Sequence, residues 1–227
     1  VCRSRSRADE FIASAKARGV TGIDFIEGDM SSIAAAAEAA ERIRAEAGEF
    51  GAFVHNAALW PTEKRLTVDG FEESFMVNHL APFVINRALA DLFAANRARV
   101  VQISAGLYIA GMKDYAATAA GDNFSLMKTY ATTKLLNLIA TMRFAELWRD
   151  AGVTLNAIHP GVVNTGLGEM KGPAGILLGL VKKLWLRPSE GAAAPVRLVA
   201  DPAYEGLTEA YFDRFTRAKL APIALDG

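Results

Sequence analysis

Apolar residues recur at helical spacing in long stretches of the chain, and most of these stretches are bounded by residues that start or stop helices. Residues 31–47 begin with two serines and are followed by Gly48, and residues 7–18 are followed by Gly19. Pro82 is expected to kink or restart the helix in which it lies. The predicted helices cover residues 7–18, 31–47, 69–95, 125–150, 173–186 and 188–199.

Short apolar runs between these stretches predict strands. The predicted strands cover residues 21–26, 52–54, 100–103, 153–158 and 210–212. Residues 105–124 contain three glycines and are expected to form a loop. Strands that alternate with helices of about ten or more residues indicate a parallel α/β sheet covered on both faces. We therefore predict a doubly wound parallel sheet, in a single domain over residues 1–227.

The residues at the ends of the predicted strands are candidates for ligand binding. In open α/β sheets, ligands bind beyond the carboxyl ends of the strands. Asp29, Asn56, Ser104 and Pro160 stand at or just beyond four of these ends. The strand pattern therefore selects these four positions before any family is considered.

The composition excludes several classes of protein. Lys plus Arg and Asp plus Glu number 25 each, and this balance argues against a nucleic-acid partner bound by bulk charge. The three histidines and one cysteine are scattered and form no metal-ligand pattern. No apolar run reaches the roughly 18 residues of a membrane span, and the first residues lack the apolar region of a signal peptide. The single Cys2 allows no intrachain disulfide, which favours a reducing, cytoplasmic compartment.

Tyr130 and Lys134 form the most informative pair of residues in the chain. They are four residues apart in a predicted helix and so share one of its faces. A free tyrosine has a pKa near ~10, and a cation held close to it favours the phenolate and lowers that pKa. Tyr130 would then be able to exchange a proton with a substrate oxygen. The alternative is a chance pair, because two such residues alone make a weak motif.

Several further segments match the motifs of one family in the family's order. They are Gly-Asp-Met-Ser at 28–31, His-Asn-Ala-Ala at 55–58, Val-Asn-His-Leu-Ala-Pro-Phe at 77–83, His-Pro-Gly-Val-Val-Asn-Thr at 159–165, Ser-Glu-Gly-Ala at 189–192 and Tyr-Phe-Asp at 211–213. Together with Tyr130 and Lys134, they resemble the short-chain dehydrogenase/reductase family, and more narrowly its retinol-dehydrogenase-like branch. The resemblance covers nearly the whole chain. It implies a Rossmann-like fold and an NAD(P)-dependent oxidoreductase that interconverts an alcohol and a carbonyl.

The resemblance also implies roles for individual positions. Tyr130 would be the general acid in reduction and the general base in oxidation, and Lys134 would lower its pKa and hold the nicotinamide ribose. Asn78 would support the proton relay, and Ser104 is the candidate for the serine that polarises the substrate oxygen. Cofactor-binding candidates are Arg3, Asp29, Met30, Asn56, Ala57, Ala58, Tyr130, Lys134, Pro160, Val162 and Thr165. Three of these have a local alternative, since Asn56 would also serve as a turn or capping residue, and Asp29 and Thr165 as caps of the segments that follow them.

Three departures from the family pattern limit this prediction. The family's Gly-rich phosphate-binding turn is not found, so we expect a chain that lacks the first strand-turn-helix and is an N-terminally incomplete, inactive fragment. The sheet would then have a gap beside residues 52–54. The family's serine aligns with Ala105, which leaves open whether the neighbouring Ser104 replaces it. Ala58 takes the place of a glycine, a change that the turn is expected to tolerate.

The cofactor and the substrate can be predicted only as classes. Arg3 follows the expected second strand, and a basic residue there suits the 2′-phosphate of NADP, with NAD as the alternative. Residues 175–186 are apolar with two adjacent lysines. They would close over a hydrophobic substrate, rest on a membrane surface or form an ordinary core helix.

A second class of function stays open on the sequence alone. A non-catalytic dinucleotide-binding or interaction protein could be built on the same fold, because fold does not determine function. Ala105 and the missing Gly-rich turn favour this hypothesis, whereas Tyr130, Lys134 and Asn78 favour an enzyme acting on a small-molecule alcohol or carbonyl.

Overall fold

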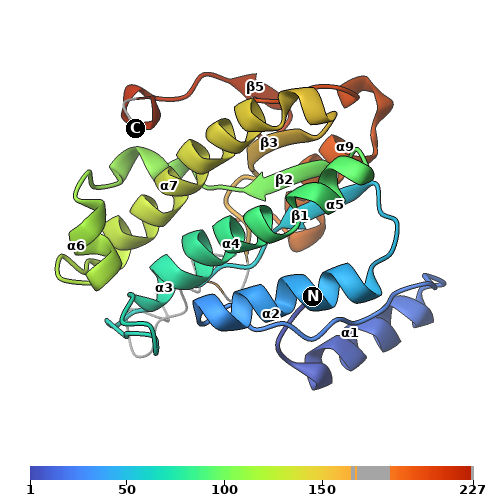
Figure 1. Cartoon of the computed structure of the whole chain (residues 1–227), viewed down its shortest axis with the longest axis horizontal. Coiled ribbons are helices and arrows are strands. Elements are labelled where there is room, and N and C mark those ends of the chain that lie inside the picture. The colour runs from blue at the N-terminus through green and yellow to red at the C-terminus, as the bar shows by residue number, and fades with distance from the viewer. Residues whose placement is uncertain (165–166, 168–184, 226–227) are drawn as a thin grey trace.

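A central sheet organises the computed structural model, which describes residues 1–164, 167 and 185–225. Among these residues the strands are β1 (Ala52–His55), β2 (Arg99–Ile103), β3 (Thr154–His159), β4 (Tyr211–Asp213) and β5 (Thr216–Ala218), in that spatial order (Figure 1). The first four run parallel, and β5 pairs antiparallel with β4. The predicted Rossmann-like parallel sheet is confirmed. The short antiparallel β5 was not predicted, because its residues are mostly polar or charged.

Helices cover both faces of the sheet. One face carries α2 (Ile33–Glu46), α4 (Ala81–Ala88), α5 (Ala90–Ala95) and α7 (Leu126–Leu147), and the other carries α9 (Pro188–Ala200). Val100 of β2 packs toward the first group, in a cluster with Ile85 and Phe144. Val101, the next residue, packs with Leu198 of α9 on the opposite face. This alternation is the one expected of a strand buried on both sides.

The remaining elements are short, apart from the first helix. They are α1 (Arg5–Ala17), α3 (Glu73–Phe75), α6 (Tyr115–Ala120), a π-helical turn at Met76–Leu80, and 3₁₀ turns at Gly106–Ala110, Arg149–Ala151, Pro202–Tyr204 and Pro222–Ala224. Helix α1 begins two residues before the predicted helix 7–18 and ends one residue before it. Gly19 comes after its C-cap with a φ of +80°. The helix predicted over 173–186 lies largely in residues 173–184, outside the described residues.

Two local predictions were wrong, and a third is confirmed in one of its two outcomes. Residues 21–26 form no strand: pairing there is limited to one parallel bridge, between Cys2 and the next residue, Glu27, in which the Cys2 N–H donates to the Ile26 carbonyl. Residues 105–124 are not all loop, since Asp114 caps α6 by accepting from the Ala117 N–H. The long helix predicted over 69–95 is divided at the π turn and at Leu89, and α4 starts at Ala81 with Pro82 in its first turn, which is the restart that the sequence predicts as one of two outcomes. Pro82 lies in the first turn of α4, where its missing N–H costs nothing.

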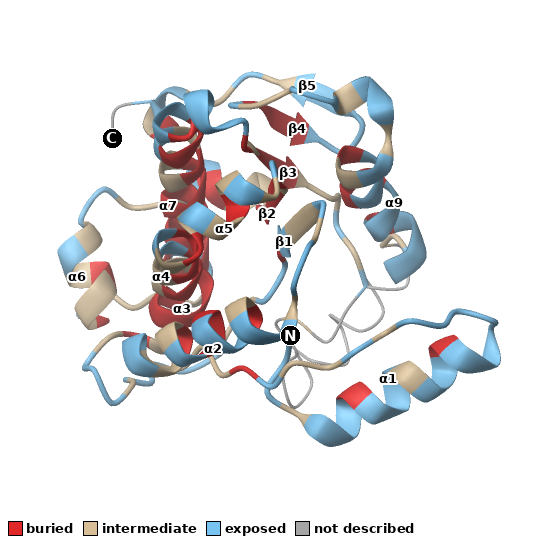
Figure 2. Cartoon of the chain, turned by 45° about the vertical axis from the view of Figure 1, so that its right-hand side comes forward, coloured by how far each residue is buried: buried red, intermediate tan, exposed pale blue. Residues whose placement is uncertain are grey.

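The N-terminal region packs less tightly than the rest. Helix α1 lies at the edge of the molecule in both views, away from the sheet (Figures 1 and 2). Strand β1 is bonded to β2 on one edge only, and Val54 in its middle is 40% exposed. The bridge between Cys2 and Glu27 stands apart from the sheet. Within the described residues, the sheet therefore has the open edge beside β1 that the sequence predicts.

Candidate functional site

Tyr130 and Lys134 lie on the buried face of α7, just beyond the carboxyl end of β2. The Lys134 ammonium donates a 3.0 Å hydrogen bond to the carbonyl of Ile103, the last residue of that strand. Its nitrogen is 5.7 Å from the centre of the Tyr130 ring. Tyr130 is 6% exposed and Lys134 is 2% exposed. The structure thus brings together a phenol and a cation at a strand end, where ligands bind in such sheets.

Burial controls the proton affinity of both residues in this structure. It raises the pKa of Tyr130 to about 12 and lowers the pKa of Lys134 to about 8. Both directions follow from the cost of placing a charge away from water. The lowering of the Tyr130 pKa that the sequence predicts is not seen, because desolvation outweighs a cation 5.7 Å from the ring. Tyr130 is therefore a protonated phenol at neutral pH.

Asn78 ties the loop after β1 to α7. Its Oδ1 accepts from the Leu59 N–H at 2.6 Å, and its Nδ2 donates to the Leu59 carbonyl at 2.8 Å. Nδ2 also donates to Thr133 Oγ1 at 3.2 Å, and Thr133 donates in turn to the carbonyl of Tyr130. Asn78 lies in the π turn, and its own carbonyl accepts from Asn137 Nδ2 at 2.8 Å. The fully buried amide thus joins three segments around Tyr130, in keeping with the frequent use of π turns at functional sites.

Ser104 and Ala105 follow β2 directly. The Ser104 N–H continues the ladder by donating to the Ile158 carbonyl at 2.8 Å. Its hydroxyl is buried and has no hydrogen-bond partner among the described residues. Ala105 is half-buried and stands at the start of the 3₁₀ turn Gly106–Ala110. Ser104 is 3% exposed and thus as buried as Tyr130 and Lys134, whereas the half-buried position, Ala105, lacks a hydroxyl.

The residues expected at the adenosine end differ in their contacts and exposure. Asp29 binds its own turn: Oδ1 accepts from the N–H groups of Met30 and Ser31, and Oδ2 accepts from the Ser31 hydroxyl. Ser32 is the N-cap of α2, so the alternative that Asp29 caps this helix is wrong. The other candidates differ in exposure: Arg3, Asn56 and Ala57 are exposed, while Met30 and Ala58 are half-buried.

Pro160 and Val162 follow β3 at the same end of the sheet. Pro160 is half-buried and Val162 is exposed. Between them, Gly161 has a φ of +92°, a backbone conformation that favours glycine. The backbone of Val162 accepts from the Leu186 N–H at 2.9 Å, which fixes this turn. Thr165 and residues 175–184 lie outside the described residues, so the predictions for them stay untested.

Two of the three histidines, His55 and His79, lie within hydrogen-bond distance of asparagine side chains. Burial lowers the pKa of His55 and of His79 to about 4, so both are neutral at pH 7. His55 Nε2 is 2.8 Å from Asn86 Oδ1, and His79 Nδ1 is 3.3 Å from Asn137 Oδ1. Burial also lowers the pKa of His159.

Trp60 is a residue of the site that sequence reasoning missed. Its indole stacks on the Tyr130 ring, with centroids 4.5 Å apart and an angle of 13° between the planes. Its Nε1 donates to the Leu126 carbonyl at 2.6 Å. The only sequence signal is its position, four residues after Asn56 in a strand-end loop.

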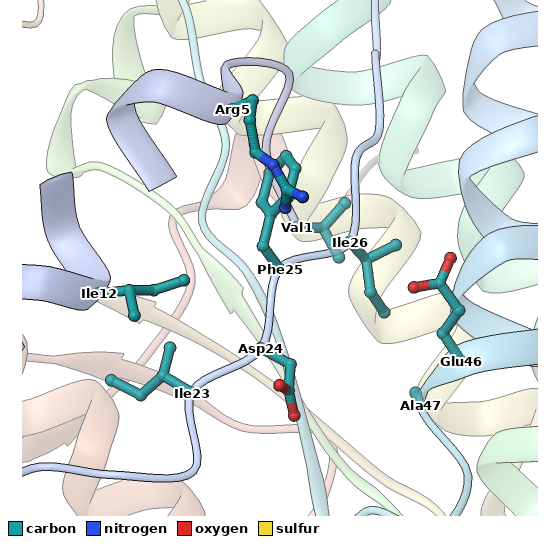
Figure 3. A pocket seen from close by; sticks show the side chains of 9 residues that line it. All are labelled: Val1, Arg5, Ile12, Ile23, Asp24, Phe25, Ile26, Glu46 and Ala47. Carbon is teal, nitrogen blue, oxygen red and sulfur yellow. The ribbon is translucent and has the colours of Figure 1, made fainter. Parts of the chain in front are cut away.

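A pocket of about 560 Å³ lies away from Tyr130, between α1, residues 23–26 and the end of α2 (Figure 3). Its lining is mixed, with Ile12 and Phe25 beside Arg5, Asp24 and Glu46. Tyr130, Lys134, Asn78 and Ser104 do not line it. We therefore place the candidate active site at the end of β2 and not in this pocket.

Membrane-spanning helices and clusters of metal ligands are both absent from the described part of the chain. No helix there combines the length and the apolar character needed to cross a bilayer. No group of three or more His, Cys, Asp and Glu residues in the same ranges is arranged to hold a metal ion.

The chain is similar to several known proteins. Retinol dehydrogenase 14 of Mus musculus is 28% identical over 241 residues, which cover 99% of this chain and 72% of the relative. Retinol dehydrogenase 13 of Mus musculus is 30% identical over 210 residues, with coverages of 87% and 62%. A crystal structure of a short chain dehydrogenase from Burkholderia cenocepacia in complex with NADP superposes with a TM-score of 0.69 at 21% identity. It covers 94% of this chain and 83% of its own.

The sequence pattern of one family matches most of the chain. That family is described as short chain dehydrogenase, and its pattern matches residues 1–174. The match includes Asn78, Ser104, Tyr130, Lys134 and the turn after β3. The chain belongs to the short-chain dehydrogenase family.

Proposed function

We propose that this chain carries the site of an NADP-dependent oxidoreductase that interconverts an alcohol and a carbonyl on a hydrophobic small molecule. The observation that carries the proposal is the buried pair of Tyr130 and Lys134 at the end of β2, in a chain of this family. Tyr130 is the group that exchanges a proton with the substrate oxygen. At neutral pH it is a protonated phenol, because burial raises its pKa to about 12. The protonated form is the one from which a proton passes to a carbonyl oxygen, but the raised pKa by itself makes this phenol a weaker acid.

Lys134 and Asn78 support Tyr130 in different ways. The Lys134 ammonium is held at the end of β2 by the Ile103 carbonyl, where it would bind ribose hydroxyls and stabilise any negative charge on Tyr130. Asn78 holds the loop after β1 against α7 through Leu59 and Thr133. It therefore fixes the distance between the cofactor side and the acid/base side of the site.

The described residues include candidates for binding the nicotinamide and adenosine ends of the cofactor, but no Gly-rich turn for its pyrophosphate. When bound, the nicotinamide cofactor supplies the hydride that the protein lacks. Lys134 and Pro160 would hold its nicotinamide end, and Asn56, exposed just after β1, its adenosine ribose. The exposed Arg3 suits a 2′-phosphate. A Gly-rich cradle for the pyrophosphate is not found in the described part of the chain, so we expect weak binding.

Relatives and structural neighbours support the choice of NADP and of a hydrophobic substrate. Two neighbours carry this cofactor: the Burkholderia cenocepacia protein with NADP, and a blue fluorescent protein from a metagenomic library with NADPH. The names of the relatives include retinol dehydrogenases. For this chain we propose a substrate with an apolar body and one alcohol or carbonyl group.

A hydride-transfer assay tests the proposed reaction. The chain is incubated with an apolar aldehyde and with NADPH that carries deuterium at C4 of the nicotinamide, at the highest practicable cofactor concentration. The missing Gly-rich turn predicts an inactive fragment, whereas the proposed function predicts an alcohol with deuterium on the former carbonyl carbon, because the hydride moves to carbon and the proton to oxygen. A folded chain that produces no labelled alcohol from a panel of aldehydes would contradict the proposal.

A non-catalytic binding protein is the second candidate function. The specific observation in its favour is the half-buried Ala105 at the position where the family has its serine. Under this alternative NADPH binds, but no aldehyde is reduced even when cofactor binding is saturated.

A further inference from the structure

The indole of Trp60 covers one face of the Tyr130 ring. The two rings are nearly parallel, at 13°, and their centroids are 4.5 Å apart. This spacing lies at the short end of the range for aromatic pairs and leaves no room for a third group between the rings. Trp60 is half-buried, whereas Tyr130 is almost completely buried. The indole therefore supplies part of the cover that separates this phenol from water.

Hydrogen bonds to the Trp60 indole and to the backbone of the preceding residue hold Trp60 in place beside Tyr130. Its Nε1 donates to the carbonyl of Leu126, the first residue of α7. The backbone of its neighbour Leu59 is bound at both its N–H and its carbonyl by the Asn78 amide. One anchor thus belongs to the helix that carries Tyr130, and the other to the buried asparagine that spans the site.

We propose that Trp60 is a positioning residue for Tyr130, whose stacked indole fixes the plane of the phenol and keeps water from that face of the ring. The proposal rests on the proposed role of Tyr130 as the proton-exchanging group. A phenol free to tilt would present its hydroxyl to the substrate oxygen in many geometries. Small displacements of a reacting group lower the rate steeply, by as much as about 10²-fold for 1 Å.

A side chain that merely filled space would be replaceable by any apolar group of similar size. The geometry requires instead a flat ring parallel to the phenol. Trp60→Phe keeps such a ring and loses the bond to Leu126, whereas Trp60→Leu keeps apolar bulk and loses the stack. Trp148→Phe is a matched control, because Trp148 packs against Phe144 in the core and does not stack on Tyr130.

Kinetics of benzaldehyde reduction with NADPH give the first measurement. We expect Trp60→Leu to lower kcat by on the order of 10²-fold with a smaller change in KM, since orientation is lost more than binding. Trp60→Phe is expected to retain most of kcat, and Trp148→Phe to retain it nearly completely. Equal kcat values for Trp60→Leu and the parent chain would overturn the proposal.

Two spectroscopic measurements are independent of activity. The emission of Trp60, obtained as the difference between the parent chain and Trp60→Phe, should shift to longer wavelength in Tyr130→Leu but not in Tyr130→Phe. The ionisation of Tyr130, followed by phenolate absorbance against Tyr130→Phe, should move to lower pH in Trp60→Leu as water reaches the ring. Lys134 is the charged group that faces this ring, and it remains in both chains.

These measurements separate the inference from the function on which it rests. If Tyr130→Phe keeps full activity, the proposed function fails while the emission shift still reports the stack. If Trp60→Leu does not fold, the emission of Trp60 in Tyr130→Leu decides the matter. An unchanged emission there would show that the indole does not depend on the phenol, and would overturn the proposal.

Discussion

The region around α7 and the region around α1 differ in how much of each helix is buried. Most of α7 is buried, including Tyr130 and Lys134, and it packs against β3 and the loop after β2 (Figure 2). Helix α1 buries only two alanines, Ala8 and Ala15, and leaves Phe11 58% exposed. The same chain thus contains a closed acid/base region and an open N-terminal region.

This difference bears directly on function. The acid/base residues already have fixed partners, because Lys134 is bound to β2 and Asn78 joins the loop after β1 to α7. The residues expected to contact the adenosine end are exposed, or, like Asp29, are bound to their own turn. Under the proposed function, the residues of the proton transfer are therefore preorganised in this structure, whereas those that would bind the cofactor are not.

Two phenylalanines test the comparison most strongly. Phe93 is 0% exposed and touches Phe53 and Trp148, so Phe93→Ala should cost about 3–5 kcal/mol of unfolding free energy. Phe11→Ala, on the open side of α1, should stay within about 0.5 kcal/mol. Urea denaturation of both variants measures the difference. Similar losses for the two would mean that α1 is packed as firmly as the core.

The serine position tests how complete the acid/base region is. Ala105→Ser places a hydroxyl at the half-buried position and should raise kcat/KM by up to about 10²–10³-fold, the usual value of one such donor. Ser104→Ala should change kcat/KM little, because Ala105 and not Ser104 aligns with the family's serine. Steady-state kinetics of both variants decide between the positions. A large loss in Ser104→Ala would show that Ser104 is the active serine.

Arg3 tests the open region, with the smallest expected effect. An exposed ion pair contributes about 1 kcal/mol or less, so Arg3→Ala should reduce the preference for NADPH over NADH by less than about tenfold. Competition between the two cofactors measures this preference, and Arg18→Ala at the far end of α1 is a matched control. An unchanged preference would remove Arg3 from the cofactor site.

Most elements of the central sheet and its covering helices could be predicted from the sequence, whereas the pairing near α1 could not. Strands β1, β2 and β3 and helices α2, α7 and α9 were predicted because periodic apolar residues and clear caps coincide there. Residues 21–26 have the composition of a strand but form none. A strand needs a second segment to pair with, and the pairing here is limited to the bridge between Cys2 and Glu27. The π turn at Met76–Leu80 leaves no signature that separates it from an ordinary helix in the sequence.

The arrangement of two candidate residues could be predicted from the sequence, but their electrostatics could not. The spacing of Tyr130 and Lys134 correctly placed both on one face of α7. The direction of the Tyr130 pKa could not be predicted, because it depends on burial produced by the whole fold. Trp60 was missed for a similar reason, since its stack on Tyr130 joins residues 70 positions apart along the chain.

The central claim is that Tyr130 exchanges the proton in an NADPH-dependent reduction. Tyr130→Phe removes that hydroxyl and keeps the ring, and Tyr108→Phe removes an equally buried hydroxyl that is bound to the backbone of Ala221. Measurement of kcat/KM for an apolar aldehyde should show a loss of about 10²–10⁴-fold in Tyr130→Phe and little change in Tyr108→Phe. Full activity in Tyr130→Phe would contradict the account.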